Sequence, residues 1–310
     1  QTTSKHHKQP RKKKEKKRKR KDKMVKRILI TNDDGIRAPG IIAIVEALAR
    51  VPEYDIRVVS PAVEQSAKGH SITITAMLSV HKFQLPEPLT NIPAFAVNGT
   101  PADCVKVSLL SKLFEDGWKP DLVVSGINRG GNFGLLAHYS GTLGAAREAN
   151  ICGLPSVALS LAFISGSQFD HFQLAANYSV EIIAKAFEHV AQAPDVFSRV
   201  MFNVNFPNIS EEKIKGWKFT RQGYSQIEDR YVKDRASSTA DVINFRLEGN
   251  LSIKDQDESY DAAALFNGWI SVSVLGIMYR INFAHFEQVT SLVRGSVEAL
   301  DEKFQQSPPE

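Results

Sequence analysis

The stretch "RILITNDDGIRAPG", residues 27–40, begins as an apolar run and ends in a turn that contains Gly and Pro. Two adjacent acidic residues, Asp33 and Asp34, stand where the apolar run ends. The run predicts a buried strand at residues 27–31, and the following "GIIAIVEALARV", residues 40–51, has the apolar spacing of a helix. A buried strand, a polar turn and a helix are the expected beginning of an α/β fold.

Short apolar runs continue to alternate with helical stretches as far as residue 215. The run "DLVVS", residues 121–125, is apolar at successive positions, which is typical of a parallel strand that is buried on both faces. Crossover helices between such strands imply parallel pairing. We therefore predict a doubly wound, mainly parallel, Rossmann-like α/β fold with helices on both faces of the sheet, forming the core at residues 24–215.

Two segments of this core allow more local predictions. In "TPADCVKVSLLSKLF", residues 100–114, Thr100 and Asp103 have the spacing of a capping box, so a helix is expected to begin there. The alternating pattern of "SITITAMLSVHKF", residues 71–83, predicts a longer strand or one arm of a hairpin. The two cysteines, Cys104 and Cys152, match no metal or redox spacing and are expected to be reduced packing residues.

The character of the chain changes after residue 215. Residues 216–265 are polar, charged and rich in strand formers, which predicts an extended hairpin arm. The segment "GWISVSVL", residues 268–275, reads as a returning strand, and residues 283–304 have the pattern of an amphipathic C-terminal helix. We treat residues 216–310 as a second region of the chain.

The basic character of the chain belongs to its first residues. Residues 1–23 hold 13 Lys or Arg and 2 Asp or Glu, a net charge of +11, so the rest of the chain carries −6 of the total of +5. Such a segment is expected to be disordered, and it is either a nuclear-localisation or nucleic-acid-binding arm or an extension upstream of a start at Met24. Because no basic patch continues beyond it, a nucleic-acid partner is not expected.

Neither a membrane nor a secreted location is expected. No apolar run approaches the roughly 18 residues that a membrane-spanning helix needs, and no signal-peptide pattern is present. Free cysteines are typical of a reducing compartment. We expect a cytoplasmic protein.

Polar side chains follow several strands at the point where each strand ends. Asp33 and Asp34 follow the first, Ser66 lies in "SPAVEQSAKGHSIT" (residues 60–73), and Asn128 and Asn132 lie in the Gly-rich "SGINRGGNFG" (residues 125–134). Ligands bind beyond the carboxyl ends of the strands in open α/β sheets. Two carboxylates, a hydroxyl and an amide oxygen would suit Mg²⁺, Mn²⁺ or Ca²⁺. Each piece also has an ordinary reading as turn or loop chemistry.

A fourth segment, "HYSGTLGAAREA" (residues 138–149), offers an anion site. Ser140, Gly141 and Thr142 stand where a helix is predicted to begin, and small residues there allow an anion to approach free N–H groups. Simple N-capping by Ser or Thr is the alternative. A hard cation beside an anion pocket is the equipment of metal-assisted phosphoester hydrolysis.

These four segments, in this order, resemble the SurE family of survival proteins, the 5′/3′-nucleotidases. The similarity extends over residues 25–280 and includes "NGTPADCV", "FNVNFP" and "YDAAALFNGWISVSVL". The resemblance implies that the metal ligands are Asp33, Asp34, Ser66 and Asn128. It implies that the phosphate pocket is lined by Asn32, Asn132, Ser140, Gly141 and Thr142.

The activity that this resemblance implies is hydrolysis of nucleoside 5′- and 3′-monophosphates to nucleoside and phosphate, with short polyphosphate as a further substrate. The resemblance also implies one Mg²⁺ or Mn²⁺ per subunit, with Asp33, Asp34 and Asn128 as the catalytic residues. The family also implies a homodimer or homotetramer in which the arm and the C-terminal segment pack on, or are exchanged with, a partner subunit.

Several alternatives remain open from the sequence. The proton acceptor is Asp33 in our preferred mechanism, with His70 and His138 as alternatives, and Lys68 or His70 is a candidate to face a phosphate. Asp33 or Asp34 would instead be the nucleophile in an aspartyl-phosphate mechanism. A non-catalytic nucleotide or nucleic-acid binder that uses the basic tail, or a scaffold that assembles through its arm, are the alternatives outside enzymes.

Overall fold

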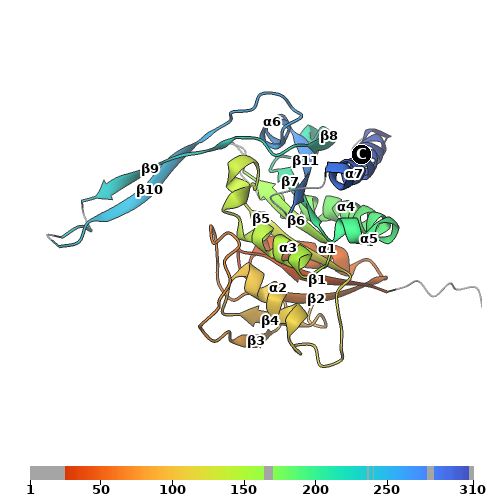
Figure 1. Ribbon diagram of the computed structural model, residues 1–310, viewed down its shortest axis with the longest axis horizontal. Coiled ribbons are helices and arrows are strands. Elements are labelled where there is room, and N and C mark those ends of the chain that lie inside the picture. The colour runs from red at the N-terminus through yellow and green to blue at the C-terminus, as the bar shows by residue number, and fades with distance from the viewer. Residues whose placement is uncertain (1–24, 164–169, 236, 240, 278–282, 307–310) are drawn as a thin grey trace, which may run out of the picture.

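A nine-stranded sheet forms the centre of the computed structural model, which describes residues 25–163, 170–235, 237–239, 241–277 and 283–306 (Figure 1). Across the sheet the strands lie in the order β3 (Val80–Phe83), β4 (Ala94–Val97), β2 (Tyr54–Pro61), β1 (Lys26–Thr31), β5 (Leu122–Arg129), β6 (Ser156–Ala162), β7 (Val200–Pro207), β11 (Trp269–Gly276) and β8 (Gly216–Thr220).

Most neighbouring strands in this sheet are parallel. The pairs from β4 through β2, β1, β5 and β6 to β7 are all parallel, and β8 is parallel to β11. Only the pairs β3–β4 and β7–β11 are antiparallel among the described strands of the sheet. The predicted mainly parallel α/β fold is therefore confirmed.

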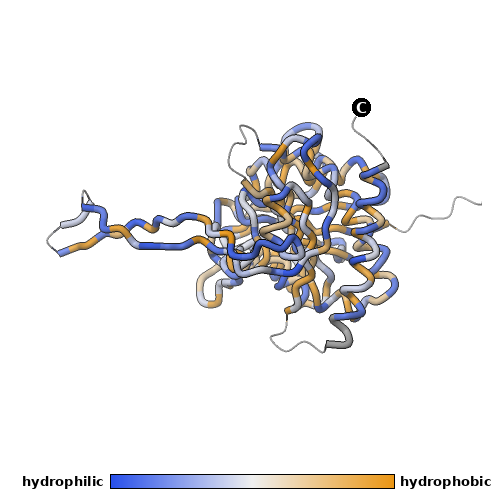
Figure 2. The backbone as a smooth tube through the Cα atoms, turned by 90° about the horizontal axis from the view of Figure 1, so that it is seen from above, coloured by the Kyte–Doolittle hydropathy of each residue, from blue (hydrophilic) through white to orange (hydrophobic). Residues whose placement is uncertain are grey.

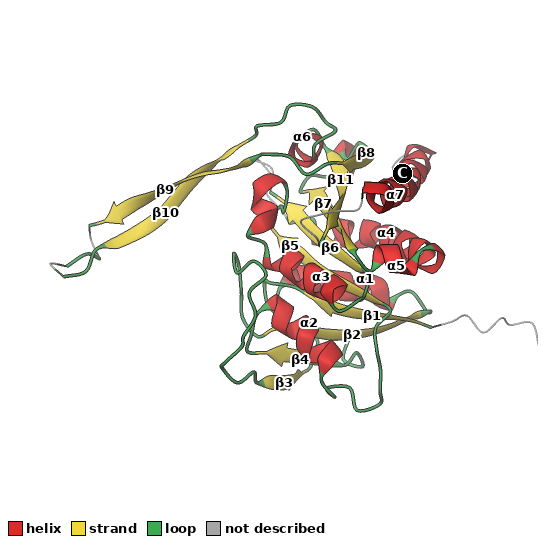
Figure 3. Cartoon of the chain, viewed as in Figure 1, coloured by secondary structure: helices red, strands yellow, loops and turns green. Residues whose placement is uncertain are grey.

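Helices cover both faces of the sheet (Figure 3). In β1, Ile28 and Ile30 pack into one apolar cluster with α1 and α4, whereas Leu29 between them packs into another with α2 and α3. Successive side chains of a strand point to opposite faces, so this division gives three layers. The helices are α1 (Pro39–Ala49), α2 (Pro101–Leu110), α3 (Gly141–Ile151), α4 (Phe172–Gln192), α5 (Pro194–Phe197), α6 (Asp261–Phe266) and α7 (Phe283–Gln306), with the 3₁₀ turns η1 (Gly134–His138) and η2 (Glu211–Lys213).

The local predictions had mixed outcomes. The capping box at the start of α2 is confirmed, because the Thr100 hydroxyl accepts from the Asp103 N–H and the Asp103 carboxylate accepts from the Thr100 N–H. Of the two predictions for residues 71–83, the longer strand is wrong, since only β3 is a strand there, whereas β3 does pair antiparallel with the next strand, β4, as an arm of a hairpin would. Ile74 is 83% exposed and Met77 is 91% exposed, so the alternating pattern has no second layer to pack against. Cys104 and Cys152 are both free thiols.

The order of the strands locates the region where a ligand is expected. From β1 the chain moves outward to β2 and β4, and then returns to place β5 on the other side of β1. The carboxyl ends of β1 and β5 therefore flank the point at which the direction of winding reverses, where α/β sheets bind ligands. Asp33 and Asp34 follow β1 directly, and Asn128 lies at the end of β5.

The region after residue 215 is divided between the sheet and an extension. Strands β8 and β11 join the central sheet, while β9 (Gln226–Asp234) and β10 (Asn244–Ser252) pair only with each other and project away from it as an arm (Figures 1 and 2). No helix among the described residues is both long and apolar enough to cross a membrane. The prediction for the basic tail falls on residues outside the described ones.

Close packing of α1 on β5 requires a glycine at position 40. A Cβ at Gly40 would lie 1.9 Å from the Ile127 carbonyl oxygen and 3.0 Å from a ring carbon of Phe172, whereas a Cβ at Gly295 of α7 would meet no atom within 4 Å. We expect Gly40→Ala to lower the free energy of unfolding by about 2 kcal/mol or more, because main-chain atoms cannot move aside locally.

The matched control is Gly295→Ala, which is expected to raise the free energy of unfolding by roughly 0.5–1 kcal/mol, since alanine is the better helix former. Denaturant unfolding of both variants checks the pair. Equal effects of the two substitutions would contradict the close packing of α1 on β5.

Candidate active site

Asp33 connects the end of β1 to the beginning of α3. Its Oδ1 accepts a 2.6 Å hydrogen bond from the Thr142 hydroxyl, and its Oδ2 accepts a 3.1 Å bond from the Thr142 N–H. Gly141 allows this approach, because a Cβ there would lie 3.1 Å from Asp33 Oδ2. Asp33 is 4% exposed, and its burial, opposed by the Thr142 bond and reinforced by the neighbouring Asp34, raises its pKa to about 6.

Asp34 connects the same turn to the end of β5. Its Oδ2 accepts a 2.8 Å hydrogen bond from the N–H of Arg129, the residue that follows Asn128. Burial raises the pKa of Asp34, the Arg129 N–H opposes that shift, and the charge of Glu64 adds to it. None of the ion pairs between described residues involves Asp33 or Asp34. The two carboxylates are thus held by hydrogen bonds and form no ion pair, and the charge of the nearby Arg129 opposes the rise in the pKa of Asp34.

The loop after β2 lies against this turn. The Gln65 N–H donates to the Asp33 carbonyl at 2.7 Å, which places the loop that carries Ser66 against the acidic turn. Ser66 itself is exposed, and its hydroxyl donates to Glu64 Oε1 at 2.6 Å. The structure therefore brings the Ser66 loop to the site, with the hydroxyl bound to a carboxylate of its own loop.

The two predicted asparagines occupy different positions in the Gly-rich segment. Asn128 is 9% exposed and its Nδ2 donates to the Gly130 carbonyl at 2.8 Å, so Oδ1 is the remaining polar atom of its side chain. Asn132 is 6% exposed, and its Nδ2 donates to the Ser160 hydroxyl at 2.8 Å. Ser160 is aligned with Asn128 in the sheet, so the hydroxyl that binds Asn132 belongs to the strand next to Asn128.

Other predicted residues are built into the turns. Asn32 is fully buried, its Nδ2 donates to the Gly35 carbonyl at 2.9 Å, and its Oδ1 accepts from the Ser60 hydroxyl. Asn32 therefore connects the acidic turn to Ser60 at the end of β2 through its buried side chain. Ser140 caps α3, since its hydroxyl accepts from the Leu143 N–H at 3.1 Å.

The N-terminus of α3 is consequently less open than the sequence indicates. Two of its first three N–H groups already have side-chain acceptors, Asp33 for Thr142 and Ser140 for Leu143. The N–H of Gly141 is the remaining one. An anion beside Asp33 would meet that group and the positive end of the helix dipole.

The candidate basic groups lie beside this region. His70 Nε2 is 2.7 Å from Glu148 Oε2, and Lys106 lies 2.9 Å from the other oxygen of the same buried carboxylate. His138 Nε2 is 3.5 Å from the Gln222 amide. Lys68 is exposed. His70 is therefore engaged with α3 through Glu148.

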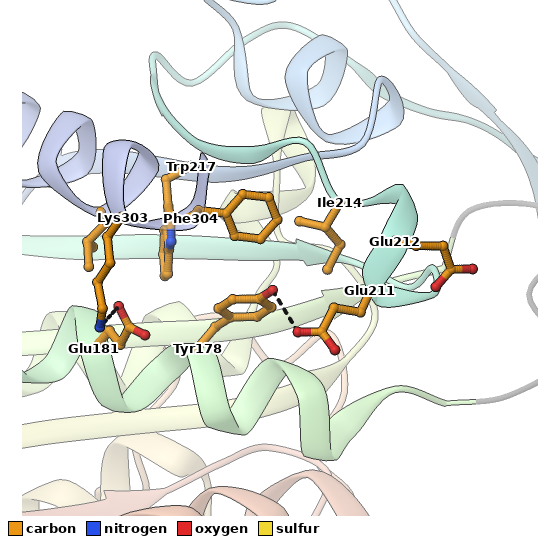
Figure 4. Close-up of a pocket in the computed structure, with 9 residues that line it drawn as sticks. Tyr178, Glu181, Glu211, Glu212, Ile214, Trp217, Lys303 and Phe304 are labelled. Atoms are coloured by element: carbon orange, nitrogen blue, oxygen red, sulfur yellow. Dashed lines mark hydrogen bonds and ion pairs between the residues drawn. The ribbon is translucent and has the colours of Figure 1, made fainter. Parts of the chain in front are cut away.

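Several cavities formed by the described residues lie outside the acidic turn, two of them along α3 and α4. One, of about 750 Å³, borders α3 and includes His70, His138 and Arg147 in its wall. The other, of about 210 Å³, lies between α4 and α7, where Tyr178, Glu211 and Trp217 face one another, and it contains none of the predicted site residues (Figure 4). Only the first borders loops that carry the site.

Several residues that support the site were not identified from the sequence. Ser60 holds Asn32, Ser160 holds the Asn132 side chain, and Glu148 holds His70. A further pair, Asn203 and Asn205 of β7, contacts the main chain of Asn132. The signal for this pair was present, because asparagine at alternate positions of "FNVNFP" is unusual in a strand buried on both faces.

The pKa of Asp33 makes stability depend on pH in protein stripped of metal. A folded-state pKa of about 6 against an ordinary value of 3.8 means that folding favours the protonated carboxyl. The stabilisation is complete below about pH 3.8 and is lost as the pH rises to about 6, a loss of about 3 kcal/mol. We expect the unfolding free energy of the wild type to fall over this range relative to that of Asp33→Asn.

Asparagine suits the same place, because its Oδ1 and Nδ2 can bind the Thr142 N–H and hydroxyl. Chemical unfolding of both proteins at pH 4, 5, 6 and 7 measures the difference. Parallel pH profiles would show that the Asp33 carboxyl does not titrate near pH 6.

Comparison with known proteins places these observations in a family. The family model "Survival protein SurE" matches residues 28–229. A 5′-nucleotidase SurE of Natranaerobius thermophilus is 36% identical over 248 residues, covering 80% of this chain and 91% of that protein. The corresponding protein of Syntrophobacter fumaroxidans is 35% identical over 269 residues, covering 86% and 98%.

The fold agrees with a solved structure as well. The crystal structure of the SurE protein from Aquifex aeolicus matches with a TM-score of 0.65 and 32% identity, covering 86% of this chain and 99% of that chain. The matched segments carry the acidic turn, the Gly-rich loop and the start of α3. The chain belongs to the SurE family.

Proposed function

We propose that this chain is a divalent-metal-dependent phosphomonoesterase that releases phosphate from nucleoside 5′- and 3′-monophosphates, and from short polyphosphate as a further substrate. The names of the curated relatives support the nucleotidase activity. The observation that carries the rest of the proposal is the buried Asp33 with its half-buried neighbour Asp34, at the switch point of the sheet beside the N-terminus of α3.

The residues at this point fit a hard divalent cation. Asp33 is buried and Asp34 is half-buried, no ion pair between described residues neutralises either carboxylate, and burial raises the pKa of both. An amide oxygen of Asn128 and the hydroxyl of Ser66 would complete an all-oxygen set. No group of three or more His, Cys, Asp or Glu side chains in the described ranges is arranged to hold a metal, which disfavours a zinc-type site there.

Mg²⁺ or Mn²⁺ bound by these four side chains would polarise the phosphoryl group and acidify a water molecule. The side chains and main chain of the protein orient the Asp33 carboxylate and the phosphate. Thr142 holds both oxygens of Asp33, so the carboxylate keeps one rotamer, and the Gly141 N–H at the helix terminus attracts a phosphate oxygen. In this proposal Asn132 lines the far side of the phosphate pocket.

The proton acceptor in this proposal is Asp33. In the metal-free chain burial raises the pKa of Asp33 to about 6, and in this proposal an oxygen of the carboxylate that the cation leaves free takes the proton. His70 is the weaker alternative because its Nε2 is already hydrogen-bonded to Glu148.

The proposal includes a homodimer or homotetramer formed through the arm. The arm exposes large apolar side chains, among them Tyr231 at 72% and Phe245 at 58% exposure, and a two-stranded hairpin has no core of its own. A partner subunit that covers β9 and β10 would bury these side chains. Residues 216–310 would then be the part of the chain that packs on, or is exchanged with, its neighbour.

Activity measurements test the function directly. Phosphate release from a panel of nucleoside 5′- and 3′-monophosphates should require Mg²⁺ or Mn²⁺ and should stop with a chelator. Asp33→Asn is expected to lower kcat/KM by about 100-fold or more, because it removes a charge from the cation site.

The control for this experiment is Asp195→Asn in α5, an exposed residue that precedes the amino end of β7 at the opposite edge of the sheet. It should retain the wild-type rate. Full activity of Asp33→Asn would contradict its assignment as a metal ligand. Absence of turnover on every nucleotide tested would favour the alternative of a non-catalytic binding protein.

The arm makes a separate prediction about assembly. Because Gln226 and Ser252 are paired neighbours, residues 227–251 can be replaced by a short Gly-Ser turn without straining β8 or β11. We expect the shortened protein to be smaller than the wild-type oligomer when its mass is measured by light scattering. An unchanged number of subunits would show that the arm does not carry the interface.

A further inference from the structure

Strand β7 combines complete burial with two amide side chains. All eight residues of Val200–Pro207 are buried, and Asn203 and Asn205 are each 0% exposed. Burying an amide costs free energy unless its polar atoms are hydrogen-bonded. The partners of these two amides therefore explain why asparagine is present in the strand.

Both amides bind the main chain of a single residue, Asn132. The Asn132 N–H donates to Asn205 Oδ1 at 2.8 Å, and the Asn132 carbonyl accepts from Asn203 Nδ2 at 2.7 Å. A longer bond of 3.3 Å runs from Asn205 Nδ2 to the same carbonyl. The main chain of Asn132 is thus fixed from both sides by one strand of the sheet, while Ser160 fixes its side chain.

The loop that contains Asn132 needs such support. It is preceded by Gly130 and Gly131, and the first of these has a positive φ of +138°. Glycine leaves the backbone the most conformational freedom, so a loop of this composition does not hold one geometry unaided. The two contacts from β7 supply the missing constraint.

We propose that Asn203 and Asn205 are positioning residues that hold Asn132 in place and thereby set the affinity of the site for phosphate. This inference rests on the proposed function, in which Asn132 lines the phosphate pocket. Neither asparagine touches the substrate in this proposal, and both act through the main chain of Asn132.

One atom argues that stability alone does not maintain these amides. Asn203 Oδ1 is buried and has no hydrogen-bond partner among the described residues. An unpaired buried acceptor of this kind is destabilising, and an apolar residue of similar size would avoid it. The unpaired oxygen therefore does not explain Asn203, whereas its Nδ2 atom does, because that atom binds the Asn132 carbonyl.

A neighbouring group of hydroxyls provides a matched control. Ser271 of β11 is aligned with Asn205 across the sheet, is also 0% exposed, and binds the Thr220 hydroxyl at 2.8 Å. Ser271→Ala removes a buried hydrogen bond from the same sheet without touching Asn132. If the polar residues of the sheet had only a structural role, Ser271→Ala and the substitutions in β7 would have similar effects on phosphate affinity.

The test compares Asn203→Leu, Asn205→Leu and Ser271→Ala in the full chain, with Asn203→Ser as the milder variant in case leucine prevents folding. We expect both leucine variants to raise KM and the inhibition constant of inorganic phosphate about tenfold, with kcat changed less than about threefold. Ser271→Ala should leave all three constants unchanged, and thermal unfolding should show Asn203→Leu to be at least as stable as Ser271→Ala.

A double-mutant cycle separates positioning from general damage. In an Asn132→Ala background the additional change Asn205→Leu should have little further effect on phosphate inhibition, because the positioned side chain is already absent. Additive losses, or equal effects of Ser271→Ala and the leucine variants, would overturn the proposal.

Hydrogen exchange provides a measurement that does not depend on turnover. Amides of residues 130–133 should exchange faster in Asn205→Leu than in the wild type or in Ser271→Ala. If no nucleotide were hydrolysed but this exchange difference appeared, the proposed function would fail while the restraint on the loop would stand. Unchanged exchange in an active enzyme would refute the restraint.

Discussion

A carboxylate buried at the end of a strand must find hydrogen-bond donors, and Asp33 finds both of its donors on Thr142. This contact ties β1 to α3, two elements separated by more than a hundred residues of sequence. It also explains the glycine before Thr142, because a Cβ at position 141 would press on the same carboxylate. The adjacent Asp34 is then left to bind the end of β5.

Holding two like charges in this place opposes stability. Burial and mutual repulsion raise the pKa of Asp33 to about 6, so near neutral pH the metal-free fold carries an ionised group that its environment disfavours. Strain of this kind is expected at functional sites, where local rules are broken for the sake of chemistry. Within the proposed function, a divalent cation is the partner that removes the repulsion.

The fold was predictable because its signals are local and repeated. Continuous apolar runs such as residues 121–125, separated by helical stretches, require a parallel sheet covered on both faces. The capping box of Thr100 and Asp103 was equally predictable, since two residues three positions apart define it. The error at residues 71–83 has the opposite cause, because alternation predicts a strand only where a partner edge and a core are available, and neither is encoded locally.

The positions of the candidate site residues relative to the sheet were predictable, and their contacts were less so. Strand ends and the order of the sheet place Asp33, Asp34 and Asn128 together, but no sequence rule shows that Asn32 is turned inward. The same limit applies to Glu148, whose role as partner of His70 depends on how a loop lies on α3. Side-chain direction within a polar turn is set by tertiary contacts, and a single sequence does not contain them.

The polar residues of β7 show that tertiary contacts also reach the site from the strand beneath the Asn132 loop. A strand buried on both faces would be most stable with apolar residues throughout, yet Asn203 keeps an amide whose oxygen has no partner among the described residues. The amide is informative because its buried oxygen has no partner among the described residues, whereas its nitrogen binds the Asn132 loop. Buried polar atoms that stability does not explain are therefore the places where this fold is best searched for residues that act on the site from a distance.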